Sequence, residues 1–477
     1  MKRVLIGVAI GGVAVVSLAM GGARGAGGAV AAHSVRPVPA SAGHVSAATL
    51  SFPPDTNFCL ANIGIACYQP AQLVKAFDLH PLFAQGLTGK GSTIVIVDSF
   101  GSPTIKADLD TFDDTFHIPS PPSFKIIQPA GDVPPFPQDP FGPGDRSGWG
   151  VETSLDVEWS HALAPGANIL LVETPTSEVE GVQGFPEIVK AENYVIDHNL
   201  GDVITQSFGA TEETFPSKDS IFDLRSAFFN ARKNHVTVLG ASGDEGSTDL
   251  LSDTSCCYPM QVNSWPSSDP LVTSVGGLQL NLNESGQTIA PPNVWNDVAI
   301  GIDAAGGGGP SHVFGRPSFQ NDVKNLVGKH RGTPDISMSA AVNGAVDTFY
   351  SFCDYNRVDP STGQPPLCGP QWHLVGGTSE ASPEFAAIIA IADQVAGKRV
   401  GYINDALYEL NDAANNGLVD VTAGNNTLTF CQSGCGTSSE VDVTVPGFAA
   451  GPGYDLASGW GTVDAKDFVR ALAAATS

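Results

Sequence analysis

Charge is scarce in this chain. Asp, Glu, Lys and Arg together make up 15% of its 477 residues, well below the roughly one quarter that is usual in soluble domains. The shortage is mostly of basic residues, because 23 Lys and Arg face 49 Asp and Glu, for a net charge of −26. Such a surface repels phosphate backbones and anionic lipids, which argues against nucleic acid and membrane surfaces as partners. Few charges remain once the carboxylates are protonated, so limited self-repulsion favours work at low pH.

Long apolar runs are absent after the first residues of the chain. Met1-Lys2-Arg3 precedes an apolar run from Val4 to Met20, and small residues that include Ala29-Val30-Ala31 follow. This order is typical of a secretory signal, so we predict a signal peptide over residues 1–31 and a secreted, extracellular protein without stable membrane association after signal removal. A membrane anchor is the alternative, since the run is near the shortest that spans a bilayer. Residues 32–55, rich in Ala, Ser and Pro, are predicted to form a linker or short propeptide before a single domain over 56–477.

The cysteines lack the paired CxxC and histidine spacing of a zinc site. Their number, eight, is even, and export would permit disulfides. Adjacent Cys256 and Cys257 either form a vicinal bridge or remain free thiols. Local pairing is expected for the other six: Cys59 with Cys67, Cys353 with Cys368, and Cys431 with Cys435.

Apolar segments of two kinds alternate along the globular part. Continuous β-branched or apolar runs at 92–97, 169–172, 203–205 and 236–239 predict buried strands, and helical patterns lie at 150–163, 185–198 and 218–233. This alternation predicts an α/β fold with a doubly wound, mainly parallel sheet flanked by helices. Residues 121–143 are rich in Pro and Gly and are predicted to be a loop, and 382–396 is predicted to be an apolar helix.

A serine follows a glycine-rich turn just before that last helix, in Gly376-Gly377-Thr378-Ser379. Glycines permit close approach of a substrate backbone, and a helix N-terminus favours developing negative charge. Ser379 is therefore either a nucleophile or a plain helix cap.

A base for that serine has to come from somewhere other than a histidine motif. The chain contains no His-Gly-Thr-His stretch, and His161, His235 and His373 stand in contexts typical of structural or exposed residues. Glu152 and Asp156 are spaced i and i+4 on a predicted helix and so share one face. Two such acids repel one another unless they share a proton or a function, although a solvated acidic stripe is the simpler interpretation.

A third acid stands where α/β active sites are built. Asp244 lies in the segment 241–246, which comes after the predicted strand 236–239, at the carboxyl end of a parallel sheet. On its own it is equally compatible with a turn-forming loop residue.

Together these motifs resemble those of the sedolisin family, the serine-carboxyl peptidases, over roughly residues 58–477. The order of the motifs along the chain matches as well. The motifs that carry the resemblance are Gly89-Lys90-Gly91, the Glu152/Asp156 helix, Ser207-Phe208-Gly209, Ser242-Gly243-Asp244, Val275-Gly276-Gly277, Pro334-Asp335-Ile336-Ser337 and Gly377-Thr378-Ser379.

The resemblance implies a subtilisin-like fold and a serine-type peptidase that cleaves protein or peptide substrates at acidic pH through an acyl-enzyme. It implies a catalytic triad of Ser379, Glu152 and Asp156, with Asp244 at the oxyanion hole. The implied edge of the substrate cleft is Ser207, Phe208 and Gly209. Cleavage within chains is expected, and removal of tripeptides is the alternative inside the same family. The protein is expected to be a monomer.

The resemblance also implies a calcium-binding loop region near the C-terminus. One Ca²⁺ ion is expected, since Asp side chains and carbonyl oxygens are the hard donors that this ion prefers. The implied ligands are Asp420, Val421, Gly451, Gly453 and Asp455, the middle three through backbone oxygens.

Three other functions compete with this interpretation. A subtilisin-type Ser-His-Asp peptidase would use Asp98 after the first buried strand, but it needs a histidine motif that is missing. A secreted binding protein on a degenerate peptidase scaffold would need none of the catalytic positions. A glycosidase built on Glu152 and Asp156 would leave Ser379 and Asp244 without a role.

Overall fold

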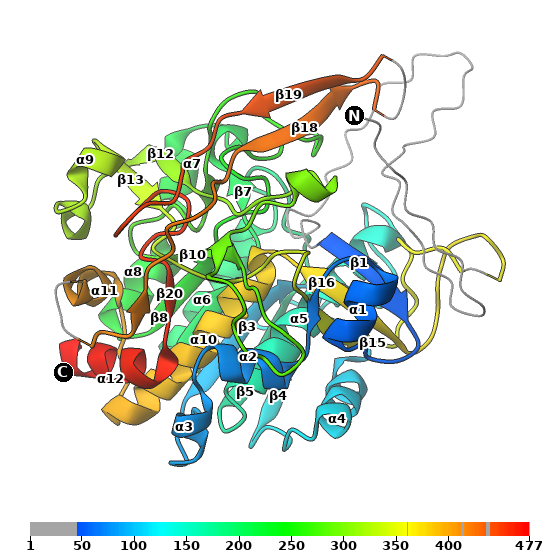
Figure 1. Cartoon of the computed structure of the whole chain (residues 1–477), viewed down its shortest axis with the longest axis horizontal. Helices are drawn as coiled ribbons and strands as arrows, with labels where there is room; N and C mark the ends of the chain where they lie inside the picture. Colours follow the sequence, from blue (N-terminus) through cyan, green and yellow to red (C-terminus); the bar gives the residue numbers. More distant parts are fainter. Residues whose placement is uncertain (1–44, 360, 412–414, 436–438, 477) are drawn as a thin grey trace.

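The computed structural model describes residues 45–359, 361–411, 415–435 and 439–476 (Figure 1). The predicted signal peptide over 1–31 and most of the predicted linker over 32–55 lie outside the described residues. No helix in the described part of the chain is long and apolar enough to cross a membrane.

A central sheet of eight strands forms the core, as the alternating pattern predicted. Its order is β11-β10-β8-β6-β3-β5-β4, with β14 also paired to β10, and only β11 runs antiparallel to its neighbour. The bounds are β3 Thr93–Ser99, β4 Phe124–Ile127, β5 Asn168–Thr174, β6 Val203–Gln206, β8 Thr237–Ala241, β10 Thr273–Gln279, β11 Asn293–Val294 and β14 Ile336–Ser339.

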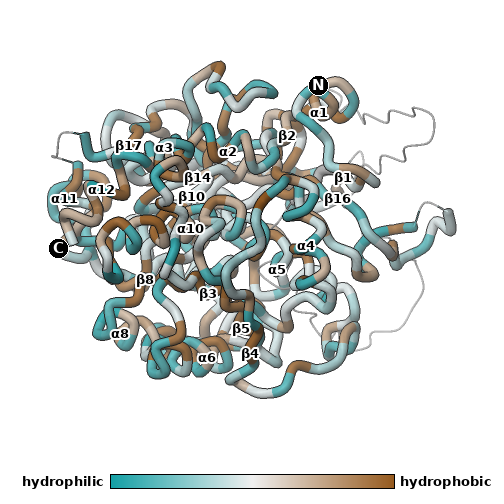
Figure 2. The backbone as a smooth tube through the Cα atoms, turned by 90° about the horizontal axis from the view of Figure 1, so that it is seen from below, coloured by the Kyte–Doolittle hydropathy of each residue, from teal (hydrophilic) through white to brown (hydrophobic). Residues whose placement is uncertain are grey.

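Side chains of β3 alternate between two cores, because successive residues of a strand point to opposite faces of the sheet. Ile94 and Ile96 join the larger core, which includes the helices α5 (Pro143–Leu163) and α10 (Thr378–Ala396). Val95 and Val97 join a second core beneath α6 (Phe185–Asp197) and α8 (Ser226–Lys233). Both faces are thus covered by helices, and Figure 2 shows hydrophobic residues concentrated around the inner strands β3, β5 and β8.

The helices α5 and α10 pack directly against each other inside the molecule. Nearly every residue of α5 from Asp145 onward is buried, as is α10 through Asp393. Gly150 permits the close packing of α5, because a Cβ at that position would meet the Phe352 ring at 2.8 Å. The two helices bring the sequence motifs around residues 152–156 and 377–379 into one place.

A smaller sheet lies beside the central one, in the order β1-β16-β15-β2. Its strand β16 (Gln371–Gly376) leads straight into α10, and its edge strand β1 (Val45–Leu50) pairs antiparallel with β16. β1 therefore begins within the stretch that composition marks as a linker. The other two strands are β2 (Cys67–Tyr68) and β15 (Ala345–Tyr350).

The remaining elements surround these layers. The strands form small two-stranded sheets, such as the β18–β19 hairpin that projects at the top of Figure 1. Their bounds are α1 Thr56–Asn62, α2 Pro70–Ala76, α3 His80–Phe83, α4 Ile105–Phe116, β7 Ala210–Thr211, α7 Lys218–Phe222, β9 Ser264–Trp265, β12 Gly309–Gly315, α9 Lys324–Val327, β13 His330–Thr333, α11 Asn404–Leu410, β17 Leu418–Val419, β18 Leu428–Ser433, β19 Val441–Val445, β20 Thr462–Val463 and α12 Ala465–Ala475.

Two predicted segments differ from the structure. The predicted loop over 121–143 contains β4, which pairs in parallel with β5. This short edge strand is only half-buried, so its sequence lacks the strong apolar run of the inner strands. The predicted helix over 218–233 is two helices, α7 and α8, and Arg225 between them turns its guanidinium to Asp269.

All eight cysteines lie in the described residues and form disulfides. The three local pairs are those that the sequence predicted, and Cys256 and Cys257, which the sequence left open, are bonded to each other.

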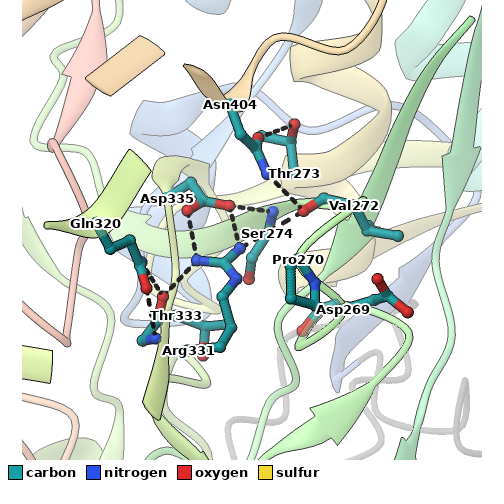
Figure 3. Close-up of polar contacts among 12 residues, drawn as sticks. Asp269, Pro270, Val272, Thr273, Ser274, Gln320, Arg331, Thr333, Asp335 and Asn404 are labelled. Atoms are coloured by element: carbon teal, nitrogen blue, oxygen red, sulfur yellow. Dashed lines mark hydrogen bonds and ion pairs between the residues drawn. The ribbon is translucent and has the colours of Figure 1, made fainter. Parts of the chain in front are cut away.

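A buried ion pair anchors the segment that leads into β14 (Figure 3). Arg331 Nη1 donates to Asp335 Oδ1 at 2.7 Å, and the second guanidinium nitrogen reaches the other carboxylate oxygen. The backbone N–H of Ser274 also donates to Asp335, at 2.8 Å, which ties this segment to β10. Both charged side chains are fully buried.

Candidate active site

Ser379 is held at the N-terminus of α10 by the turn that joins β16 to the helix. Gly377 has a φ of 145°, a value that favours glycine, and its N–H donates to the Ala340 carbonyl at 2.7 Å. Gly376 packs so closely that a Cβ would lie 2.7 Å from the same carbonyl oxygen. The turn therefore needs both glycines, and it fixes Ser379 as the second residue of the helix, 6% exposed.

Ser207 connects the nucleophile candidate to the acids of α5. Its hydroxyl donates to Asp156 Oδ1 at 2.8 Å and lies 3.3 Å from the Ser379 carbonyl oxygen. The Ser379 hydroxyl in turn reaches the Ser207 carbonyl oxygen at 3.5 Å. The sequence predicted Ser207 only as part of the cleft edge, whereas its side chain also bonds an acid of the proposed triad.

Glu152 and Asp156 are both fully buried on α5. Burial excludes the simpler interpretation of a solvated acidic stripe. Burial raises the pKa of Asp156 well above its usual range, repulsion from Asp98 and then from Glu152 raises it further, and the Ser207 hydroxyl opposes these effects. The carboxyl group is thus held in a protonated or proton-sharing state at acidic pH.

Asp98, at the end of β3, is a third member of this buried acid group. Its pKa is raised well above the usual range, first by burial and then by repulsion from Glu152. In the sequence analysis Asp98 was considered only as the acid of a competing Ser-His-Asp triad. That triad lacks its base here, because no histidine lines the cleft in the described part of the chain. His161 instead contacts the Pro119 carbonyl oxygen at 3.0 Å.

Asp244 follows β8 and faces the start of α10. Thr378 donates to Asp244 Oδ1 twice, from its N–H at 2.7 Å and from its hydroxyl at 2.8 Å. The N–H of Gly243 donates to the same Thr378 hydroxyl at 3.0 Å. Asp244 is thereby fixed to Thr378, the residue that directly precedes the nucleophile candidate on the helix.

One cleft joins most of the predicted residues. It has an open volume of about 380 Å³. Phe208 turns its ring into the core against Trp149 and Phe185, so its backbone faces the cleft. The lining residues are Ser207, Phe208, Gly209, Ala241, Gly243, Asp244, Glu245, Asp249, Ser264, Thr378 and Ser379.

Two of these lining residues had no signal in the sequence. Asp249 lies on a loop and Ser264 begins β9, 15 residues further along the chain, and the Ser264 hydroxyl donates to the Asp249 carboxyl. Neither belongs to a motif that singles it out, and only the fold brings them together. Glu245 could have been suspected, since it directly follows Asp244.

The candidate calcium residues also meet in the fold. The N–H of Gly453 donates to Asp420 Oδ2 at 3.0 Å, and the N–H of Gly451 donates to Asp455 Oδ2 at 2.9 Å. Two carboxylates from separate segments thus converge on one glycine turn, and Val421 follows Asp420 directly. This collection of hard oxygen donors fits Ca²⁺. Another acidic group, at Cys431, Glu440 and Asp442, is a poor match because the sulfur of Cys431 is bonded to Cys435.

Known proteins resemble the chain over most of its length. Kumamolisin from Bacillus sp. (strain MN-32) is 29% identical over 417 residues, which cover 85% of this chain and 63% of that protein. Tripeptidyl-peptidase 1 from Homo sapiens is 28% identical over 343 residues, 69% of this chain and 53% of that protein. The chain therefore spans less than two thirds of the length of these curated relatives.

A solved structure agrees with the sequence relatives. Pseudomonas sedolisin, a serine-carboxyl proteinase solved with pseudo-iodotyrostatin, superimposes with a TM-score of 0.64 at 25% identity and covers 85% of this chain and 97% of its own. No protein-family model matches the chain. The shared fold and these relatives support a protein similar to the sedolisin family, and to kumamolisin in particular.

Proposed function

We propose that this protein is a secreted serine-carboxyl endopeptidase that hydrolyses peptide bonds at acidic pH, with Ser379, Glu152 and Asp156 as its triad. The observation that carries the proposal is the link from Ser379 through Ser207 to a buried acid pair. Four disulfides support an oxidising, extracellular setting. We expect the enzyme to act as a monomer on protein or peptide substrates.

In the proposed mechanism Glu152 is the general base. It takes the proton of the Ser379 hydroxyl as the serine oxygen attacks the scissile carbonyl carbon, and the same proton then passes to the leaving amine. Asp156 orients Glu152, and the two buried carboxyls share a proton. Water, activated by Glu152, attacks the resulting acyl-enzyme and releases the acid product. Ser207 keeps Asp156 in place through its hydroxyl.

Asp244 supplies the oxyanion donor in this proposal. An ionised carboxylate can only accept hydrogen bonds, so Asp244 must be protonated to donate one. Thr378 donates twice to Oδ1, which leaves Oδ2 as the oxygen that carries the proton. The requirement for a neutral Asp244 is a physical reason to expect an acidic optimum.

A calcium ion held by Asp420, Val421, Gly451, Gly453 and Asp455 would be structural. It would supply positive charge between two loop segments and stabilise the folded state by mass action. The residues that would hold it follow α10 in the chain, and no step of the proposed reaction would pass through the ion.

Digestion of a diverse peptide library between pH 3 and pH 7, with products identified by mass spectrometry, tests the proposal. Ser379→Ala should abolish cleavage. Ser382→Ala is the matched control, since this buried serine of α10 hydrogen-bonds Thr205 at 2.8 Å and does not line the cleft. Internal cuts in acid support the endopeptidase, and release of tripeptides only would assign tripeptidyl-peptidase activity instead. No cleavage at any pH would favour a binding protein on this scaffold.

A further inference from the structure

Two glutamates follow the nucleophile candidate on α10 and have no role in the proposed reaction. Glu380 and Glu384 are spaced i and i+4, so they lie on one face of the helix. Both side chains are fully buried. Carboxyl groups are rarely buried without a partner of opposite charge, because desolvation strongly disfavours the ionised form.

The two carboxyls face each other and share Ser339 as a polar neighbour. They interact directly, and the N–H of Ser339 in β14 donates to Glu384 Oε2 at 3.1 Å. No Lys, Arg or His faces either group in the described residues. Burial raises the pKa of both glutamates well above the usual range. A pair of this kind loses its two protons in separate steps. The first leaves more easily, and the second, which the two carboxyls then share, is held more firmly.

This pair is adjacent to the oxyanion candidate. Thr378, two residues before Glu380, holds Asp244 by two hydrogen bonds. Repulsion between Glu380 and Asp244 contributes to the raised pKa of Glu380, and because repulsion is mutual it must also oppose the ionisation of Asp244. The proton states of the three carboxyls are therefore coupled.

We propose that Glu380 and Glu384 are positioning residues that keep the proton on Asp244, and so set the upper pH limit of the peptidase. The proposal rests on the function proposed above. As pH rises, the first of the three carboxyls to lose a proton is one of the Glu380 and Glu384 pair. The pair can ionise first because its remaining proton is shared between two oxygens and the Ser339 N–H faces the resulting charge. That negative charge beside Asp244 opposes its ionisation, and Asp244 remains a donor to higher pH.

Other titratable groups also lie around these residues. Tyr68 in β2 faces Glu380, and burial raises its pKa further from neutrality, so it stays uncharged. Glu245 faces Asp244 from its own loop and is coupled to Asp249. On α5, which packs against α10, Glu152 and Asp156 act on each other and on Asp98.

The test is the pH dependence of kcat/KM for a peptide substrate in Glu380→Gln and Glu384→Gln. We expect the alkaline limb to move about one pH unit toward acid, equal to about a tenfold loss of kcat/KM at a pH one unit above the wild-type limb. The acidic plateau should change much less. Glu380→Asp retains the charge and should restore the wild-type limb. The matched control is Asp393→Asn, which removes a buried carboxyl from the far end of the same helix, where Val400 N–H donates to it at 2.7 Å; its limb should not move.

An unmoved limb in both glutamine variants, with wild-type activity intact, would overturn the inference and leave the peptidase assignment standing. An inactive wild type would instead overturn the proposed function. If neither glutamine variant folds, carboxyl ¹³C NMR of the wild-type protein gives the same answer. The Asp244 signal should then respond in two steps as the pair and Asp244 ionise, and a single step would contradict the coupling.

Discussion

Thr378 donates two hydrogen bonds to a single carboxyl oxygen of Asp244, from its backbone N–H at 2.7 Å and from its hydroxyl at 2.8 Å. This geometry distinguishes the two oxygens of Asp244, because Oδ1 is committed to the helix start. An amide in place of the carboxyl would be oriented in the same way, with its oxygen toward Thr378 and its NH₂ where Oδ2 now lies.

Asp244→Asn should therefore retain part of the activity and lose its dependence on a proton at this position. We expect kcat at acidic pH to fall less than in Asp244→Ala, which should lose about 10²–10³ in kcat through removal of an oxyanion donor. The alkaline limb of the pH profile should move to higher pH in Asp244→Asn. Equal loss in both variants across the whole pH range would argue against Asp244 as a donor.

Ser207→Ala should impair catalysis more than folding. The change removes the hydroxyl that donates a hydrogen bond to Asp156 Oδ1 at 2.8 Å, and an unsatisfied buried acceptor costs about 1–3 kcal/mol of stability. We expect the acidic limb of kcat to shift to higher pH, since the Ser207 hydroxyl lowers the pKa of Asp156. Ser337→Ala is the control, because it deletes a buried hydroxyl that donates to the Ser458 carbonyl oxygen at 3.0 Å, away from the acids. Similar pH profiles for the two variants would remove Ser207 from the site.

The inner strands and the site motifs could be predicted from sequence because each is continuous along the chain. The run 92–97 contains four consecutive apolar β-branched residues at 94–97, and β3 occupies Thr93–Ser99. Contacts between segments far apart in the chain could not be predicted in this way. The Ser207 hydroxyl bond to Asp156 spans 51 residues, and the position of Asp98 beside Glu152 depends on how β3 and α5 pack. The sequence analysis did not single out Glu380 and Glu384, because their burial depends on how α10 packs inside the molecule.

Stability should be greatest in acid and fall as pH rises. Burial raises the pKa of Asp393 to about 7 and those of Glu192 and Asp145 to about 8. Unfolded carboxyls titrate near pH 4, so above that pH the folded state binds more protons than the unfolded state and loses stability, up to the folded pKa. Each such group costs about 1.4 kcal/mol per pH unit in that window.

Thermal unfolding between pH 3 and pH 8 measures this directly, and Tm should fall by on the order of 10 °C over the range. Glu192→Gln should reduce the slope between pH 5 and pH 8, since Glu192 is fully buried and paired with Gln206. Asp359→Asn, at an exposed carboxyl, is the control and should leave the slope unchanged. A Tm that rises toward neutral pH would contradict the raised pKa values.

Arg331→Met should destabilise the fold strongly. The guanidinium is fully buried against Asp335, and its loss leaves a buried carboxylate without its cation, which costs about 3–5 kcal/mol (Figure 3). Arg232→Met is the matched control, since the exposed pair of Arg232 with Asp405, 3.7 Å apart, should be worth at most about 1 kcal/mol. Chemical denaturation of both variants at one pH gives the comparison, and equal losses would count against a special role for the buried pair.

Removal of calcium should lower Tm without altering the residues that carry out the chemistry. An ion at a hundred times its Kd stabilises the folded state by about 2.7 kcal/mol, so a chelator should lower Tm by several degrees and added Ca²⁺ should restore it.

Asp420→Ala should abolish the response to calcium, because its carboxylate faces the Gly453 turn. Asp442→Ala is the control, since that acid lies in the separate group on the β18–β19 hairpin. Burial raises the pKa of Asp455, so this proposed ligand takes up its proton at a higher pH than a free Asp, and the affinity for Ca²⁺ should decline toward the acidic range in which we expect the peptidase to work. Calorimetry at pH 4 and pH 6 therefore distinguishes this site from nonspecific binding to an acidic surface, which Asp420→Ala would leave almost unchanged.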